Sequence, residues 1–299
     1  MKYNLKSNLF YIVLALLMLG SAKFSVAETP ENSTAQTSRR KLPDLIYKTI
    51  GEESLKLDLY LPAKTSGVSA LIIWVHGGGW RAGDKKDVPI LPLVSAGFAI
   101  ASVDYRLSGQ AKFPAQIEDV KAAIRWLRLH APDYGLDVKH FGIIGHSAGG
   151  HLASLAGITG QNLIFDVGDN LHKSSAVQAV CVMSGPSDMA TMFEGADENR
   201  RSALVALLGG SLPEKQKLAE AASPLTYVHS NAPPFLFIHG ADDQTVPVQQ
   251  AVTMSRKLEA AGVKQKLIIL PQTGHDVFAR RQQFADEVRK FFTESLGNK

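Results

Sequence analysis

From residue 45 onward, short apolar runs alternate with longer segments of helical periodicity. Eight of the runs suit β-strands, and they lie at residues 44–50, 55–61, 70–75, 98–103, 141–145, 177–183, 235–239 and 266–270. The clearest helical pattern begins at Pro114, and another closes the chain. Apolar strands separated by helices are typical of a mostly parallel sheet covered on both faces. We therefore predict an α/β fold, in which catalytic residues lie at the carboxyl ends of the strands.

The N-terminal segment has the pattern of a secretory signal peptide. Lys2 and Lys6 precede an apolar run from Leu9 to Leu19, and the segment ends in small residues at Ala27. The run is about half of the roughly 20 residues that span a bilayer, which disfavours the alternative of a retained membrane anchor. We expect a signal peptide at 1–27, a secreted or periplasmic protein without stable membrane insertion, a polar disordered linker at 28–41, and a catalytic domain at 42–299.

The charge and cysteine content exclude several classes of protein. Without the predicted signal peptide, the chain has 29 basic and 28 acidic residues, and the basic residues are scattered along the sequence rather than clustered. We therefore expect no nucleic-acid partner. The single cysteine, Cys181, lies in an apolar stretch, so we expect a core thiol and no internal disulfide. The sequence predicts no oligomeric state.

The GHSAG sequence at residues 145–149 matches the G-x-S-x-G nucleophile elbow. A predicted strand precedes it and Ala-rich helical sequence follows, which is the context that the motif requires. The glycines leave room for a tight turn, and the turn presents Ser147 at a helix N-terminus that favours developing negative charge. We predict Ser147 as the nucleophile and consider the neighbouring His146 a candidate for the substrate pocket.

A glycine-rich loop, HGGGW, occupies residues 76–80 directly after a predicted strand. Glycines allow the backbone to approach a substrate and aim N–H groups at an oxyanion. We assign the oxyanion hole to Gly78, Gly79 and Ala148. A phosphate-binding loop is disfavoured, because neither a dinucleotide glycine pattern nor a Walker lysine is present. Trp80 either walls the acyl pocket or packs in the core, and the sequence does not distinguish the two.

Nine histidines compete for the role of general base. His275 follows the last predicted strand through a short loop that can bring an imidazole to Ser147, whereas His239 ends a strand in what we interpret as a structural position. The orienting acid is expected after the preceding strand, where Asp242 and Asp243 are adjacent, and we choose Asp243. Asp188 also follows a strand and is interpreted as a loop cap. No metal site or cofactor is predicted.

Four motifs together resemble the α/β-hydrolase esterases, specifically the bacterial carboxylesterase and feruloyl-esterase-like group. They are HGGGW with a following GDK, DYRL at 104–107, GHSAGGH at 145–151 and HGADDQTVP at 239–247. The chain order Ser147, Asp243, His275 is also that of an α/β-hydrolase. The resemblance covers Leu45 to the C-terminus and implies an α/β-hydrolase fold with about eight strands, cofactor-free ester hydrolysis, and Asp243 rather than Asp242 as the acid. Asp104, Tyr105 and Arg106 follow a strand and are candidates for substrate contact, but the resemblance implies that they form a structural network beneath the oxyanion loop. His146 departs from the acidic residue common before the nucleophile in hormone-sensitive-lipase relatives.

A small helical lid is expected at about 186–234, with helices near Arg200–Leu208 and Glu214–Ala222. The predicted function is an exported serine carboxylic-ester hydrolase that acts through an acyl-enzyme on small-molecule or polysaccharide-linked esters, such as acetyl or feruloyl esters of carbohydrates. A lipase would need a more apolar lid. A formamidase-type amide hydrolase shares a similar glycine loop but acts inside cells. A non-catalytic hydrolase-fold binding protein is disfavoured by the intact triad.

Overall fold

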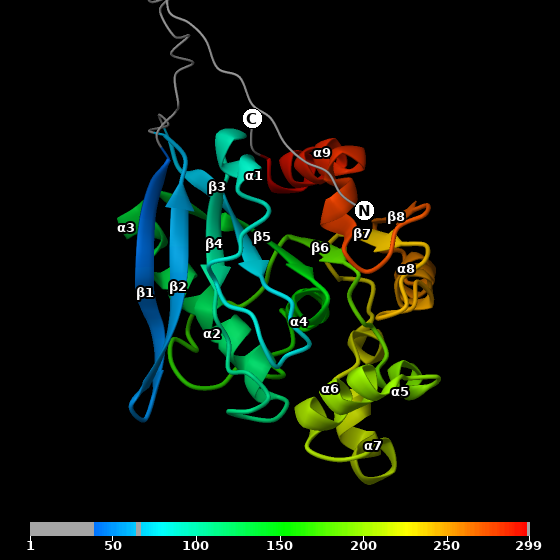
Figure 1. Ribbon diagram of the computed structural model, residues 1–299. Helices are drawn as coiled ribbons and strands as arrows, with labels where there is room; N and C mark the ends of the chain where they lie inside the picture. Colours follow the sequence, from blue (N-terminus) through cyan, green and yellow to red (C-terminus); the bar gives the residue numbers. More distant parts are fainter. Residues whose placement is uncertain (1–38, 64–66, 298–299) are drawn as a thin grey trace, which may run out of the picture. The chain divides into compact units, whose positions relative to one another are not determined.

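Eight strands form one sheet in the order β1-β2-β4-β3-β5-β6-β7-β8 (Figure 1). They are β1 (Arg40–Ile50), β2 (Glu53–Leu61), β3 (Ser69–Val75), β4 (Ala99–Val103), β5 (Leu136–His146), β6 (Ala179–Met183), β7 (Phe235–Gly240) and β8 (Gln265–Leu270). β2 pairs antiparallel with both β1 and β4, and every other neighbouring pair is parallel. The predicted α/β class and mostly parallel sheet are confirmed.

The computed structural model describes residues 39–63 and 67–297. The predicted signal peptide, 1–27, and the predicted linker up to residue 38 lie outside the described residues. Within them, no helix combines the length and apolar character needed to cross a membrane.

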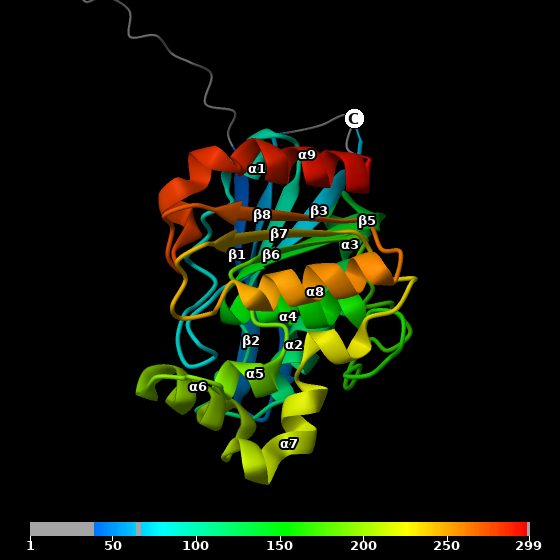
Figure 2. The same cartoon turned by 90° about the vertical axis from the view of Figure 1, so that its right-hand side faces the viewer.

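Helices cover both faces of the sheet (Figure 2). One face carries α1 (Pro92–Ser95) and α9 (Ala285–Leu296), and the other carries α2 (Ala115–Leu129), α4 (Ala148–Ile158) and α8 (Gln249–Ala260). The short α3 (Ala131–Tyr134) leads into β5. This layering explains why the parallel strands are apolar on both sides.

Two hydrophobic clusters, one on each face of the sheet, form the core. Along β3, Ile72 and Trp74 belong to the cluster with α1 and α9, whereas Leu71, Ile73 and Val75 belong to the cluster with α2, α4 and α8. All seven residues of β3 are buried. Successive side chains of a strand point to opposite faces, so each strand packs against helices on both sides. This packing fixes the position of the carboxyl ends of the strands.

The first strand begins earlier than the sequence predicted. Arg40 pairs with Leu61 and Lys41 pairs with Tyr60, so two residues assigned to the linker at 28–41 belong to the sheet. Lys41 is held there by an ion pair of 2.8 Å with the buried Asp58 and lies over the Tyr60 ring. These contacts are made by residues distant in sequence, which is why local polarity suggested a linker instead.

The segment between β6 and β7 is helical. It contains α5 (Met189–Phe193), α6 (Glu198–Leu208), α7 (Leu212–Ala221) and the 3-10 helix η1 (Pro224–Tyr227), and Figure 2 shows α5, α6 and α7 grouped on the side of α2 and α4. The helices α6 and α7 begin two residues before the predicted positions, because Asp197 caps α6 and Glu214 accepts a bond from the Ser211 N–H. Asp188 caps α5, consistent with its interpretation as a loop cap.

Candidate active site

Ser147 occupies a sharp turn between β5 and α4. Its backbone has φ 56° and ψ −122°, in the left-handed range of φ that a non-glycine residue rarely adopts. Its N–H donates to the Met183 carbonyl of β6 at 2.8 Å, which ties the turn to the neighbouring strand. Such a conformation costs about 1–3 kcal/mol and persists only where surrounding structure enforces it.

The glycines of the GHSAG sequence are required by close backbone contacts. A Cβ at Gly149 would lie 2.0 Å from the Val75 carbonyl oxygen, and one at Gly145 would lie 2.2 Å from the Gly149 oxygen. These distances are far below van der Waals contact. Glycine at 149 therefore lets the turn pack against β3, and glycine at 145 leaves room for the backbone of the turn itself.

The structure brings the three predicted catalytic residues into one hydrogen-bonded chain. His275 Nε2 lies 2.9 Å from Ser147 Oγ, and His275 Nδ1 lies 2.8 Å from Asp243 Oδ2. An ionised Asp243 favours the tautomer in which Nδ1–H donates to the carboxylate, leaving Nε2 to accept the serine proton. The three residues come from loops after β5, β7 and β8, at the carboxyl edge of the sheet.

Asp243 is fixed at both of its carboxylate oxygens. Oδ1 accepts from the N–H groups of Thr245 and Val246, each at 2.9 Å, and Oδ2 faces both His275 and the buried His239, at 2.8 and 3.3 Å. Burial alone would raise the pKa of Asp243, but bonds from His239, His275 and the Val246 N–H hold that pKa well below its usual range. The neighbouring Asp242 is exposed, and the bond to His275 comes from Asp243.

The glycine loop after β3 curves over Ser147. Gly78, Gly79 and Trp80 have positive φ values of 102°, 58° and 57°, and the Gly78 carbonyl accepts from the N–H groups of Arg81 and Ala82. Gly78 and Gly79 line the same pocket as Ser147. Ala148 is the first residue of α4, so its N–H has no partner within that helix. The residues predicted to form the oxyanion hole thus lie beside Ser147, the predicted nucleophile.

Ser147 and His275 open onto a pocket of about 280 Å³. Its other lining residues come from the glycine loop, the acid loop and the β6–β7 segment: Gly78, Gly79, Trp80, Arg81, His146, Pro186, Met192, Asn199, Arg200, Ala203, Leu204, Thr245 and Val246. Among the described residues, no group of three or more His, Cys, Asp or Glu is placed to hold a metal ion. The arrangement can activate a serine hydroxyl for attack on a carbonyl carbon.

Comparison with known proteins agrees with this geometry. Residues 57–258, which include the glycine loop, Ser147 and Asp243, match the BD-FAE family. The chain belongs to the BD-FAE family. This membership confirms the resemblance to α/β-hydrolase esterases that the motifs suggested.

Individual relatives of this BD-FAE chain are esterases. Esterase LipQ of Mycobacterium tuberculosis is 36% identical over 234 residues, which cover 76% of this chain and 54% of LipQ. The chain spans about half the length of the curated relatives it matches.

Among solved structures, a truncated form of a carbohydrate esterase from gut microbiota has a TM-score of 0.79 and 34% identity, covering 88% of this chain and 98% of that one. An acetyl ester-xyloside bifunctional hydrolase from Caldicellulosiruptor lactoaceticus has a TM-score of 0.72 and 26% identity, covering 83% and 90%.

Trp80 both packs and borders the pocket in this BD-FAE site. The ring is buried, and its Nε1–H donates to His151 Nδ1 of α4 at 3.1 Å. His151 Nε2 in turn donates to the Ala222 carbonyl at 2.6 Å. Burial lowers the pKa of His151 to about 4, so the ring is neutral near pH 7 and can accept from Trp80. This chain of bonds joins the glycine loop, α4 and the end of α7.

His146 lines the pocket and also holds the loop of His275, the predicted general base. Its Nε2 donates to the His275 carbonyl at 3.0 Å, and Ser184 Oγ donates to the same oxygen at 3.3 Å. Burial lowers the pKa of His146, which keeps the ring neutral. His146 thus positions His275 through its backbone, in addition to its predicted place in the substrate pocket.

The DYRL segment forms a structural network beneath the glycine loop. Asp104 Oδ1 accepts from the Lys85 N–H at 2.8 Å, and Tyr105 OH donates to the His76 carbonyl at 3.0 Å. The Tyr105 and His76 rings also stack, with centroids 4.4 Å apart. These contacts fix the start of the glycine loop, and they explain the network that the resemblance implied.

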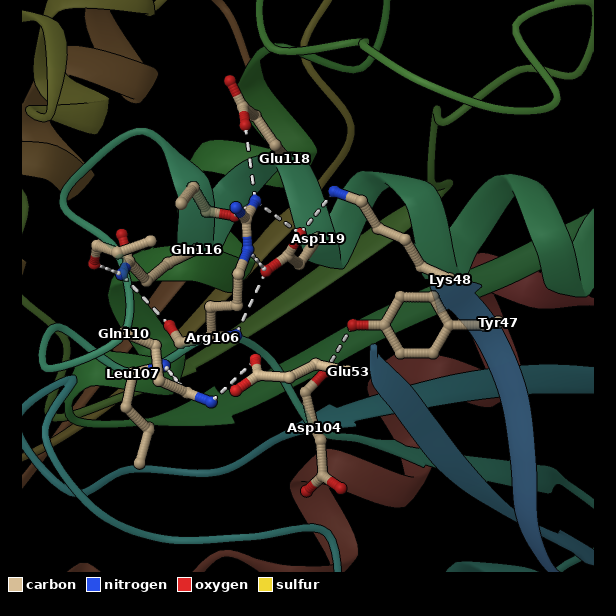
Figure 3. Close-up of polar contacts among 12 residues, drawn as sticks. Tyr47, Lys48, Glu53, Asp104, Arg106, Leu107, Gln110, Gln116, Glu118 and Asp119 are labelled. Carbon is tan, nitrogen blue, oxygen red and sulfur yellow. Dashed lines mark hydrogen bonds and ion pairs between the residues drawn. The ribbon is translucent and has the colours of Figure 1, made fainter. Parts of the chain in front are cut away.

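The same network reaches α2 and β1 (Figure 3). Arg106 and Lys48 converge on the carboxylate of Asp119, at 2.7 and 2.6 Å, and Tyr47 OH donates to the Asp104 carbonyl at 2.6 Å. Asp119 is fully buried, so the two cations compensate its charge. None of these residues lines the catalytic pocket, which identifies them as support for it.

The lid expected at about 186–234 contributes to the pocket through α6, but the residues that do so were not predicted from the sequence. The helix α6 supplies Asn199, Arg200, Ala203 and Leu204, at positions i, i+1, i+4 and i+5, which share one face. The spacing was visible in the sequence. This face of α6 lines the pocket of Ser147 because α6 packs against segments that are distant in the sequence. A local sequence pattern does not predict such packing.

Proposed function

We propose that this chain is a serine carboxylic-ester hydrolase that acts through an acyl-enzyme. The observation that carries the proposal is the chain of bonds from Asp243 through His275 to Ser147, at 2.8 and 2.9 Å, beneath a glycine loop. Esterase relatives and the BD-FAE family membership support the same reaction class.

Acylation begins when an ester carbonyl enters the pocket beside Ser147. His275 Nε2 takes the hydroxyl proton as Oγ attacks the carbonyl carbon, and Asp243 stabilises the imidazolium that forms. The N–H groups of Gly78, Gly79 and Ala148 receive the negative charge that develops on the carbonyl oxygen. His275 then gives its proton to the leaving alcohol, and the acyl group remains on Ser147.

Deacylation repeats the sequence with water. His275 takes a proton from the water as the water oxygen attacks the acyl carbon, and it returns that proton to Ser147 Oγ when the acid leaves. Apart from the ester and one water molecule, the proposed steps use only groups of the chain.

We propose short acyl esters of carbohydrates, acetyl esters above all, as the substrate class. The pocket of about 280 Å³ lies just below the range of about 300–1,000 Å³ for small-molecule sites, which favours acetyl over the bulkier feruloyl group. The carbohydrate esterase and the acetyl ester-xyloside hydrolase among the solved structures support this choice. Export by a signal peptide at 1–27 would place the enzyme where polysaccharides occur.

The test compares kcat/KM for acetylated xylo-oligosaccharides, feruloyl esters and a triglyceride emulsion. We expect the acetylated oligosaccharides to be the best substrates, and a preference for the emulsion would favour a lipase instead. Turnover of N-formylkynurenine above all esters would favour the formamidase alternative. The Ser147→Ala variant should lose nearly all hydrolysis, while Ser95→Ala, a change at an exposed serine on α1, should retain it.

If the protein hydrolyses none of these compounds, the result would favour a non-catalytic binding protein. The N-terminal sequence of the exported protein tests the export proposal separately, because cleavage after Ala27 predicts a mature chain that begins at Glu28.

A further inference from the structure

Two arginines, one on the glycine loop and one on α6, line the pocket beside Ser147. Arg81 directly follows Trp80 of the glycine loop, and Arg200 lies in the first turn of α6. Both line the pocket that contains Ser147 and His275. Neither has a role in the acyl-transfer steps described above.

Arg81 is held over the glycine loop. Its Nη2 donates to Asn199 Oδ1 at 2.8 Å and its Nη1 to Ser202 Oγ at 3.4 Å, both on α6. A Cβ at Gly79 would lie 3.8 Å from Arg81 Nε, which places the base of the guanidinium beside a predicted oxyanion donor. Its bonding partners are neutral, so its charge stays uncompensated by them.

Arg200 approaches the same pocket from the side of the acid loop. Its Nη1 donates to the carbonyl of Gln244, the residue after Asp243, at 3.3 Å, and its Nη2 donates to the Glu194 carbonyl at 3.2 Å. Its buried Nε has no hydrogen-bond partner among the described residues. A buried donor without a partner is costly, and the bonds this guanidinium does make are long.

The charge of these two arginines is not balanced at the pocket. No aspartate or glutamate is among the residues that line it. Across residues 39–63 and 67–297, neither Arg81 nor Arg200 forms an ion pair, whereas Arg106 and Arg125 pair with Asp119 and Asp166. The acids closest in sequence to Arg200 lie on the exposed side of the segment: Glu194, Asp197 and Glu198.

We infer that the pocket selects esters that carry a carboxylate close to the scissile bond. This inference rests on the proposed esterase function and narrows its substrate class. Guanidinium groups match carboxylates in shape and form charge-assisted bonds with them, and two arginines line the pocket of Ser147 here. The carboxylate belongs either to the alcohol, as in an acetylated sugar acid, or to the acyl group, as in a half-ester of a dicarboxylic acid.

The test compares charged and neutral esters that are otherwise matched. For the alcohol, the pair is an acetylated methyl glucuronoside and the corresponding acetylated methyl glucoside. For the acyl group, the pair is the 4-nitrophenyl half-ester of succinic acid and 4-nitrophenyl butyrate. The readout is the ratio of kcat/KM for the charged ester to that for the neutral one, and the pair with the larger ratio identifies where the carboxylate lies.

We expect a ratio above one for the wild type in at least one pair, and a fall of about tenfold or more in both Arg81→Gln and Arg200→Gln, because each removes a charge-assisted contact. Arg201→Gln is the matched control, since Arg201 is an exposed neighbour on α6 that does not line the pocket. Its ratio should stay at the wild-type value. Added salt should lower the wild-type ratio, because screening weakens the attraction.

A ratio of one or below in both pairs would overturn the inference while leaving the esterase proposal intact. The same holds if Arg81→Gln and Arg200→Gln change the ratio no more than Arg201→Gln does, since the arginines would then only tie α6 to the glycine loop. Failure of the wild type to hydrolyse any of the four esters would instead count against the esterase function itself.

Discussion

Asp243 differs from Asp242 in what surrounds its carboxylate. Two backbone N–H groups and two imidazoles contact Asp243, whereas Asp242 is exposed. From the residues alone the two were adjacent candidates on one loop, and only the resemblance separated them. The physical difference arises from tertiary packing, because His239 and His275 reach Asp243 from β7 and the loop after β8. The contact with His239 was not predicted.

We therefore expect Asp243→Asn to lower kcat by about 10³–10⁴-fold, as in other serine triads. An amide group facing His275 Nδ1 would stabilise the tautomer with hydrogen on Nε2, which cannot accept the serine proton. Asp242→Asn is the control and should keep kcat within about twofold, since exposed substitutions have small effects. Steady-state kinetics on a nitrophenyl ester measures both. Equal losses in the two variants would remove the basis for choosing Asp243.

At the scale of the elements, the sequence predicted what periodicity and caps encode. The eight strands and the helix after Pro114 were found because apolar runs and a 3.6-residue stripe mark them. The short helix α5 was missed, since its five residues are too few for a periodic signal. The start of β1 and the pocket face of α6 were missed for a different reason: both depend on partners far away in the sequence.

The helix α4 carries a buried group that links stability to pH. The pKa of His151 falls from the usual 6.5 to about 4 in the fold. Between pH 6.5 and 4, His151 is therefore protonated in the unfolded chain but neutral in the folded one. The free energy of unfolding consequently falls as the pH is lowered from 6.5 towards 4. A shift of this size corresponds to about 3 kcal/mol at the low end of that window.

His151→Gln should flatten this dependence. The amide can still accept from Trp80 and donate to the Ala222 carbonyl, but it does not titrate. Urea unfolding at pH 7 and pH 4.5 should show that the wild type loses about 2–3 kcal/mol more than the variant over this interval. Parallel losses would mean that His151 is protonated in the folded protein at pH 4.5.

At the scale of the whole molecule, the fold is stabilised by the packing of its hydrophobic core and not by disulfides within the chain. The chain has one cysteine, and Cys181 lies in β6, an interior strand of the sheet, with no solvent exposure. Burial raises the pKa of its thiol well above the usual range, so thiolate is scarcer at pH 8 than in a free cysteine. The sequence predicted this core thiol from the apolar stretch around it.

We expect a disulfide reagent at pH 8 to leave the native protein unmodified and to titrate one thiol per chain in denaturant. The melting temperature should be the same with and without dithiothreitol, because no disulfide holds the fold. Rapid modification of the native protein would show that β6 opens readily or that Cys181 is accessible.

Covalent labelling can establish whether Ser147 forms the acyl-enzyme. A fluorophosphonate reacts with an activated serine and leaves a stable adduct that peptide mass spectrometry can place. We expect one adduct per chain on Ser147, with esterase activity lost in proportion to labelling and no adduct in Ser147→Ala. An adduct on another residue, or full activity after Ser147 is replaced, would contradict this expectation.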